Sequence, residues 1–348
     1  MIGQGDPPMT EPLALYGAPG SPYTRKMLGV LRYRRIPYRL LLGGRMGESG
    51  MPKPKVQLLP TFYFPAADGS LEPVVDSTPI IRRLEGMYEG RSIVLPDPAL
   101  EFLNQLLEDY ADEWLTKAMF HYRWYYRPDT EKARRILPRW SHLKATATEI
   151  APLEEMIADR QISRLYVVGS NDITAPVIED AYRRFLLAFG AHMENGPYLF
   201  GTRPSAADFG MMGQLTQLAL FDPTPAAVTL EVAPKVHAWT EVMEDLSGLE
   251  PRPEDWVTRA GLPETLRGLL AELGRTYVPV FLANAAALAG GAEKVETEVE
   301  GRPWVQQPFP YQGKCLLWLR QAREALSDAD RRFVDEVMAG TGCERLFA

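Results

Sequence analysis

The chain has 348 residues, enough for two or three domains with more than one buried core. Hydrophobic residues make up 46% and charged residues 24%, an ordinary composition for a globular protein in water. The formal net charge of −7 argues against nucleic acid as a partner, because binding to phosphates needs a basic face.

The first ninety residues carry the signals of alternating strands and helices. The run L-A-L-Y (13–16) predicts a strand, and a Gly- and Pro-containing turn separates it from a helix that starts at Pro22 and stops before Pro37. A second strand is predicted over 38–42. A Gly- and Pro-rich loop with little regular structure is predicted to follow it, over 43–55.

A β-hairpin is predicted next, from T-F-Y-F-P-A (61–66) and L-E-P-V-V (71–75). The helix that follows has Ser77 as its expected N-cap and Pro79 in its first turn. The resulting order is strand, helix, strand, strand, strand, helix, which is the order of a thioredoxin-like unit.

Ser21 lies at the start of the first predicted helix, in S-P-Y-T (21–24). Cysteines at 21 and 24 would make a thioredoxin-type redox pair, but both positions carry hydroxyl groups. A helix N-terminus stabilises an anion through its unpaired N–H groups and its partial positive charge. A serine hydroxyl does not ionise there, yet it donates a hydrogen bond to a thiolate with a gain of roughly 1.5–3 kcal/mol. We therefore expect the sulfur to arrive on a ligand.

Two dipeptides supply the rest of the predicted site. A cis bond at Leu59-Pro60, just before the hairpin, would turn the Leu59 backbone outward toward an extended peptide; an ordinary trans proline is the alternative. In Asp76-Ser77, the Ser77 hydroxyl would hold a carboxylate, unless it serves only as an N-cap, and Asp76 would pair with an ammonium group. A ligand with an amino-acid end, an extended backbone and a central thiol is glutathione.

Together these segments resemble the cytosolic glutathione transferase superfamily, in its serine-type, bacterial-like form. The matching stretches are S-P-Y-T-R-K (21–26), L-L-P-T (58–61), V-V-D-S-T-P-I (74–80) and P-Y-L-F-G-T-R-P-S-A-A-D-F-G (197–210). The resemblance implies an α/β thioredoxin-like glutathione-binding domain at 1–91 and an all-α domain at 98–258. Residues 259–348 lie beyond it and are expected to form a mostly helical C-terminal extension.

The resemblance also implies roles for individual residues. Ser21 would stabilise the thiolate, Leu59 with Pro60 would contact the peptide backbone, and Asp76 with Ser77 would hold the γ-glutamyl end. Some relatives activate the thiol with a strand tyrosine instead, so Tyr16 is the alternative to Ser21, and Thr24 is a weaker third candidate.

The contacts to the glycine carboxylate are less defined by the resemblance. The span between the second strand and Pro60 is short, so the usual second helix is expected to be reduced. Lys53, Lys55 and Gln57 are the candidate residues for this carboxylate.

The helical part of the sequence offers one motif and one aromatic patch. Helical spacing from Leu100 continues into Phe120–Tyr126, which could line an electrophile pocket or form a buried seam between helices. Ser205 and Asp208 form a capping box at the start of a buried helix, with a structural role.

The extension allows several roles. It could cap the cleft, supply Trp304 or Phe309 to the pocket, or contact a partner. An amphipathic helix near its end carries Cys315, which we expect to be a buried structural cysteine rather than a catalytic thiol.

The remaining expectations concern location and partners. The two cysteines are too few for a disulfide framework, and the four histidines lack metal-ligand spacing, so we expect no metal. The first residues lack the form of a signal peptide, and the most apolar run, around 279–291, is too short to cross a bilayer. We expect a cytoplasmic protein that binds no membrane, and the resemblance implies a homodimer.

The leading hypothesis is a glutathione transferase of the detoxification type. It would use glutathione as co-substrate and activate its thiol for attack on a hydrophobic, electrophilic small molecule. One alternative is a glutathione-dependent reductase or lyase, which the hydroxyls at 21 and 24 disfavour because disulfide exchange needs a protein thiolate. The other is a noncatalytic binding or scaffold protein with the same fold.

Overall fold

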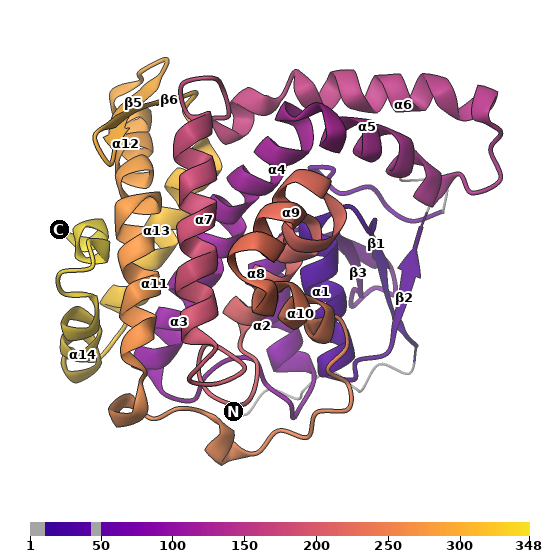
Figure 1. The fold of residues 1–348 in the computed structure, drawn as a ribbon. Helices are drawn as coiled ribbons and strands as arrows, with labels where there is room; N and C mark the ends of the chain where they lie inside the picture. Colours follow the sequence, from indigo (N-terminus) through magenta and orange to yellow (C-terminus); the bar gives the residue numbers. More distant parts are fainter. Residues whose placement is uncertain (1–10, 43–49) are drawn as a thin grey trace.

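The computed structural model describes residues 11–42 and 50–348 (Figure 1). The strands are β1 (Leu13–Tyr16), β2 (Tyr38–Leu41), β3 (Thr61–Pro65), β4 (Leu71–Val74), β5 (Val295–Val299) and β6 (Arg302–Gln306). The helices are α1 (Pro22–Tyr33), α2 (Ser77–Met87), α3 (Pro98–Tyr110), α4 (Thr116–Tyr125), α5 (Arg127–Ile136), α6 (Ala147–Ile162), α7 (Ala175–His192), α8 (Ala206–Leu215), α9 (Pro223–Val232), α10 (Pro234–Met243), α11 (Glu264–Arg275), α12 (Tyr277–Gly290), α13 (Pro310–Glu324) and α14 (Asp328–Met338). Two π-helical segments, η1 (Ala111–Leu115) and η4 (Thr216–Phe221), follow α3 and α8 directly.

Short 3₁₀ turns complete the element list: η2 (Pro138–Ser141), η3 (Leu165–Val168), η5 (Pro253–Asp255), η6 (Arg259–Gly261) and η7 (Cys343–Phe347). Of the predicted loop at 43–55, residues 43–49 lie outside the described residues, and residues 50–55 contain neither helix nor strand. None of the helices in the described ranges has both the length and the apolar character needed to cross a membrane.

The N-terminal sheet has the strand order β2-β1-β3-β4, with β1 parallel to β2 and the other pairs antiparallel. Leu15 lies opposite Phe62, and both belong to the main hydrophobic core. Because side chains alternate along a strand, Tyr16 lies on the other face, together with Ala14. The predicted thioredoxin-like order is confirmed.

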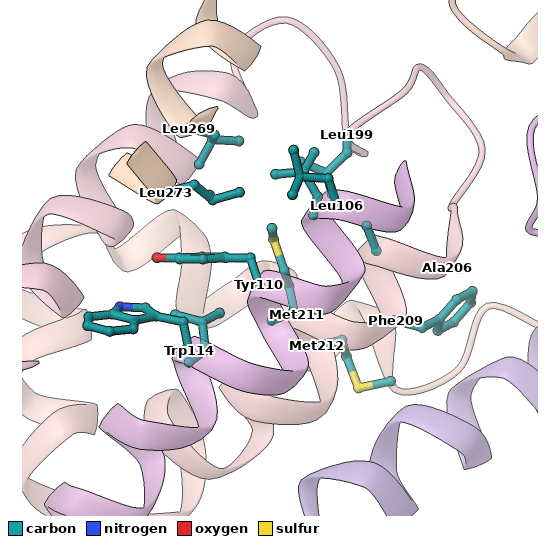
Figure 2. Close-up of a cluster of buried hydrophobic side chains, with 14 of the residues drawn as sticks. Leu106, Tyr110, Trp114, Leu199, Ala206, Phe209, Met211, Met212, Leu269 and Leu273 are labelled. Carbon is teal, nitrogen blue, oxygen red and sulfur yellow. The ribbon is translucent and has the colours of Figure 1, made fainter. Parts of the chain in front are cut away.

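Helix α1 lies between this sheet and the helical region, where it packs against α8 (Figure 1). The contact is close because glycines face the partner helix. A Cβ on Gly213 would lie 2.5 Å from the Pro22 carbonyl oxygen, and a Cβ on Gly29 would overlap Met212. The ring centroids of Tyr33 and Phe209 lie 5.7 Å apart. Figure 2 shows Phe209 and Met212, two of the α8 side chains that contact α1. The start of α1 is therefore positioned by the helical region.

The helical region and the C-terminal extension share one hydrophobic core. Figure 2 shows Leu269 and Leu273 of α11 in the same cluster as Leu106 and Tyr110 of α3. The cluster extends along the chain as far as Leu346. The extension is thus packed into the body of the protein as a folded element.

The structure corrects the expectation for Trp304. Trp304 is fully buried and lies against Trp114, with ring centroids 5.4 Å apart, so it belongs to the core and not to a pocket. The extension also contains the antiparallel pair β5–β6, which the mostly helical expectation did not include.

The aromatic patch 120–126 forms a seam between helices. Tyr122 is 2% exposed, stacks on Tyr126 at 5.8 Å and meets Tyr182 of α7 edge-on at 5.7 Å. Of the two alternatives, the structure therefore supports the buried seam.

Two capping predictions have different outcomes. Ser205 and Asp208 form the predicted capping box, in which the Ser205 amide and hydroxyl donate to Asp208 Oδ2 at 2.8 and 2.7 Å. The prediction of Ser77 as N-cap is wrong by one residue, because Asp76 occupies that position and Ser77 is the first residue of α2.

Replacing Gly213 with alanine tests the close packing of α1 on α8. The added methyl group would collide with the Pro22 carbonyl, so we expect the free energy of unfolding to fall by about 2 kcal/mol in urea denaturation. Gly268→Ala is the control, because nothing lies within 4 Å of its added Cβ in mid-helix; it should be neutral or up to about 1 kcal/mol more stable. Equal effects of the two substitutions would contradict the packing account.

Candidate active site

Ser21 is the N-cap of α1, and its hydroxyl faces the segment before β3. The Ser21 Oγ accepts a hydrogen bond from the Thr24 amide at 3.2 Å and donates one to the Leu59 carbonyl oxygen at 3.3 Å. An O–H···O bond is usually 2.7–2.8 Å long. The bond to Leu59 is therefore long, and a stronger acceptor placed nearby would compete for the hydroxyl proton.

Thr24 has a structural role in this turn. Its side chain is fully buried, and its Oγ1 accepts a hydrogen bond from the Ala18 amide at 3.3 Å. A Cβ on Gly17 would lie 2.6 Å from the Thr24 methyl carbon, so the two residues fill the space beneath the turn.

The turn before Ser21 is held by donors from the helical region. Gln217 Nε2 donates to the Pro19 carbonyl at 3.2 Å, and Arg123 Nη1 donates to the Gly20 carbonyl at 2.9 Å. Arg123 is itself fixed by a buried ion pair with Asp222 at 2.8 Å. These bonds satisfy the carbonyl groups that would otherwise place negative charge beside the N-terminus of α1.

The predicted backbone contact at Leu59-Pro60 has the expected geometry. The Leu59–Pro60 peptide bond is cis, as predicted, and leads directly into β3. Since the Leu59 carbonyl accepts from Ser21, the structure brings the hydroxyl and the peptide-contact residue together.

Asp76 has an unusual backbone conformation and an unexpected partner. Its φ of 82° lies in the region that non-glycine residues rarely adopt, and its side chain makes no capping bond to α2. Instead, the Tyr311 hydroxyl, from α13 of the extension, donates to Asp76 Oδ2 at 2.6 Å. Backbone conformations of this kind cluster at ligand sites.

Ser77 is linked to a buried ammonium group. Lys26 Nζ donates to the Ser77 Oγ at 3.1 Å, to Glu108 Oε1 at 2.7 Å and to Asp112 Oδ2 at 2.5 Å. Because the Ser77 oxygen accepts from Lys26, its own proton has to be donated elsewhere. This arrangement suits a hydroxyl that donates to a ligand carboxylate.

The charges around Lys26 determine its protonation state. Burial opposes its charge but is outweighed by Asp112 and Glu108, so the pKa of Lys26 is raised and the ammonium form persists. Burial is likewise outweighed at Glu108, whose pKa is lowered by Lys26 and Arg82. At Asp112 burial prevails over the attraction of Lys26 and raises the pKa to about 6.

Two further buried acids adjoin this network. Burial and then neighbouring carboxylates raise the pKa of Glu113 to about 8; burial raises that of Asp109 to about 7. The Tyr277 hydroxyl of α12 donates to Asp109, and Gln312 Nε2 of α13 donates to the Glu113 carbonyl at 3.3 Å. The extension therefore contacts the acids of α3 and η1 directly.

The other predicted site residues lie in β1 and in the segment between β2 and β3. Tyr16 is the last residue of β1, and strand alternation places its side chain on the sheet face opposite Leu15 and the main core. Lys53, Lys55 and Gln57 are all exposed, in the segment between β2 and β3. Residues 50–60 contain no helix, and residues 43–49, which belong to the same span, lie outside the described residues.

The two cysteines are both buried and free. Burial and then Asp109 raise the pKa of the Cys315 thiol far above its usual range. Within the described ranges, no three His, Cys, Asp or Glu side chains come together in a group that could hold a metal ion.

Sequence reasoning missed Lys26 and Tyr311. Lys26 had a local signal, because it falls on the same helical stripe as Pro22 and Val30, and a lysine on an apolar stripe needs a buried partner. Tyr311 had none, since 235 residues separate it from Asp76.

Lys26→Met tests the buried ion network. The substitution leaves Glu108 and Asp112 without their ammonium partner, so we expect the free energy of unfolding to fall by about 4 kcal/mol. Lys117→Met is the matched control, because Lys117 is equally buried but donates to the neutral oxygens of Val168 and Gln306. A loss at Lys26 no larger than that at Lys117 would show that the ion pairs contribute little.

Glu113→Gln tests the raised pKa values. Between about pH 4.5 and pH 8, the folded chain holds a proton on Glu113 that the unfolded chain releases, so stability falls as pH rises. The variant should flatten this decline by up to about 1.4 kcal/mol per pH unit in denaturation series. Glu149→Gln is the control; the Glu149 pKa is lowered by hydrogen bonds from Thr146, so its contribution changes below this window. An unchanged slope in Glu113→Gln would contradict the account.

A family comparison matches the N-terminal part of the chain. Residues 15–92 match the family model described as glutathione S-transferase, N-terminal domain. A comparison with curated proteins gave no match.

Three solved structures are similar at low sequence identity. A glutathione S-transferase from Methylobacterium radiotolerans JCM 2831, in complex with glutathione sulfonate, is 16% identical, with 73% of this chain and 95% of that chain covered and a TM-score of 0.40. A glutathione S-transferase from Rhodospirillum rubrum F11 is 18% identical over 72% and 98% of the chains, with a TM-score of 0.40. A glutathione transferase homologue from Lodderomyces elongisporus, with two glutathione molecules per subunit, is 17% identical over 67% and 99%, with a TM-score of 0.32.

The family match runs from the second half of β1 through α2, and this part of the chain contains Ser21, Leu59, Asp76 and Ser77. Residues 15–92 of this chain therefore match the N-terminal domain of glutathione S-transferases, and a largely helical region and a further C-terminal region follow them.

Proposed function

We propose that the protein is a glutathione transferase. In this proposal glutathione lies along the segment before β3, with its sulfur at Ser21, its backbone at Leu59 and its γ-glutamyl end at Asp76 and Ser77. The observation that carries the proposal is the Ser21 hydroxyl, which caps α1 and lies 3.3 Å from the carbonyl of the residue before the cis proline.

Activation of the thiol follows from two features of this position. The N-terminus of α1 favours an anion, and the Ser21 proton is held only by a long bond to Leu59. A hydrogen bond donated by this hydroxyl to a bound thiolate is worth roughly 1.5–3 kcal/mol, which lowers the thiol pKa by about one to two units. The thiolate would then attack a hydrophobic, electrophilic small molecule held nearby.

We prefer Ser21 over Tyr16 because the Ser21 hydroxyl caps α1 and contacts the Leu59 carbonyl, whereas the Tyr16 side chain lies on the sheet face opposite Leu15. A reductase or lyase is disfavoured, since the thiols of Cys315 and Cys343 are buried and their pKa values are raised by burial. The noncatalytic binding protein remains the competing proposal, and the experiment below separates it.

Several finer features are proposals of the same kind. They are Lys53, Lys55 or Gln57 as the contact for the glycine carboxylate, domain limits at 1–91, 98–258 and 259–348, a homodimer, a cytoplasmic location and a role in detoxification.

Ser21→Ala tests the proposed activation. The thiol pKa of bound glutathione, followed by the ultraviolet absorbance of its thiolate, should rise by about one to two units in the variant. Turnover of a chloroaromatic electrophile at neutral pH should fall accordingly, because the thiolate fraction falls.

Ser327→Ala is the matched control for this experiment. Ser327 is the N-cap of α14 and accepts from the Asp330 amide at 3.2 Å, so its loss removes an equivalent cap outside the site. The control should leave the thiol pKa unchanged. An unchanged thiol pKa in Ser21→Ala would refute activation by Ser21, and binding without turnover in the wild-type protein would favour the noncatalytic alternative.

A further inference from the structure

The C-terminal extension contacts the candidate site through one side chain. Tyr311 is the second residue of α13, and its hydroxyl donates to Asp76 Oδ2 at 2.6 Å. An ionised carboxylate has about four lone-pair positions on its two oxygens, so one phenol bond leaves capacity for an ammonium group. The phenol is a neutral donor, so its hydrogen bond brings no positive charge to Asp76.

The Tyr311 contact takes the place of the usual N-cap interaction. An aspartate at an N-cap ordinarily accepts from amides of its own helix. Asp76 makes no such bond to α2, and its carboxylate is directed to Tyr311 instead. The orientation of this carboxylate is therefore set by a residue outside the N-terminal domain.

The start of α13 is firmly anchored on both sides of Tyr311. Asn284 exchanges two hydrogen bonds with the backbone of Phe309, at 3.0 and 2.8 Å. Gln312 is 2% exposed and donates to the Glu113 carbonyl, and Trp318 meets the Tyr311 ring edge-on at 6.3 Å. These contacts favour a fixed component of the site over a lid that opens and closes.

We infer that Tyr311 is a positioning residue of the glutathione site, which holds the Asp76 carboxylate in the orientation that accepts the ammonium group of the γ-glutamyl end. The inference rests on the proposed function. It gives the extension a defined role, because the ligand site is complete only when α13 is packed in place. Burial, and then the bond to Asp76, raises the pKa of Tyr311 far above its usual value, so the phenol keeps its proton to donate.

The test is calorimetric titration of the full chain with two ligands, glutathione and N-acetylglutathione, which lacks the ammonium group. We expect Tyr311→Phe to weaken the binding of glutathione by about tenfold. Binding of N-acetylglutathione should be the same in wild type and variant, because the group that Tyr311 serves is missing from this ligand. A purely structural role would instead reduce the affinity for both ligands alike.

Tyr277→Phe is the matched control. Tyr277 also lies in the extension and donates its hydroxyl to a buried acid, Asp109, so its loss removes a comparable anchor away from Asp76. This variant should bind both ligands as the wild type does.

Unchanged or tighter binding of glutathione by Tyr311→Phe would overturn the inference while the proposed function stands; tighter binding would show that Tyr311 competes with the ligand. Equal losses for both ligands would overturn it as well. Failure of the wild-type protein to bind glutathione would overturn the proposed function and the inference together.

Discussion

The buried ammonium group of Lys26 is the interaction on which the candidate site depends. It starts from α1 and reaches Ser77 of α2, Glu108 of α3 and Asp112 of η1. It therefore fixes the two helix N-termini of the N-terminal domain relative to the first helix of the helical region. Helix α1 packs mainly against α8, so the bond from Lys26 to Ser77 is a direct link between the helix that Ser21 caps and the helix that follows Asp76.

Burying such a network is expensive, and its geometry has to be supported from several sides. Desolvation of two carboxylates and an ammonium group offsets much of their mutual attraction, so the pairs are weak evidence for stability. Neighbouring residues hold the helices that carry the network in position. Gly29 and Gly213 allow α1 and α8 to approach closely, and the Tyr23 hydroxyl of α1 donates to the Asp112 carbonyl at 2.7 Å. We interpret the network as a structural link that fixes the N-termini of α1 and α2 relative to each other. The proposed ligand site lies between these two helix ends and needs their positions to be fixed.

The sequence predicted those parts of the molecule whose signals are local. β1, α1, the β3–β4 hairpin, the cis bond before Pro60 and the Ser205–Asp208 capping box all depend on spacing, proline or caps within a few residues. The β5–β6 pair could have been predicted, because Val295 and Val299 alternate with charged residues and are fully buried. The segment was instead included in an extension expected to be mostly helical.

The contacts that complete the site could not be read from local pattern. Arg123 reaches the Gly20 carbonyl from 103 residues away, and Tyr311 reaches Asp76 from 235 residues away. No periodicity or motif encodes such pairs, since they follow from how whole helices pack. For the same reason the role of the extension remained open in the sequence and became definable only from the position of α13.

A crystal structure of the wild-type protein with glutathione tests the central claim most directly. The account predicts the tripeptide along the segment before β3, with its sulfur within hydrogen-bonding distance of the Ser21 Oγ and its ammonium group against Asp76. Glutathione bound elsewhere, or a region beside Ser21 that stays closed to the ligand at saturating concentration, would contradict the account, while the thioredoxin-like fold would stand.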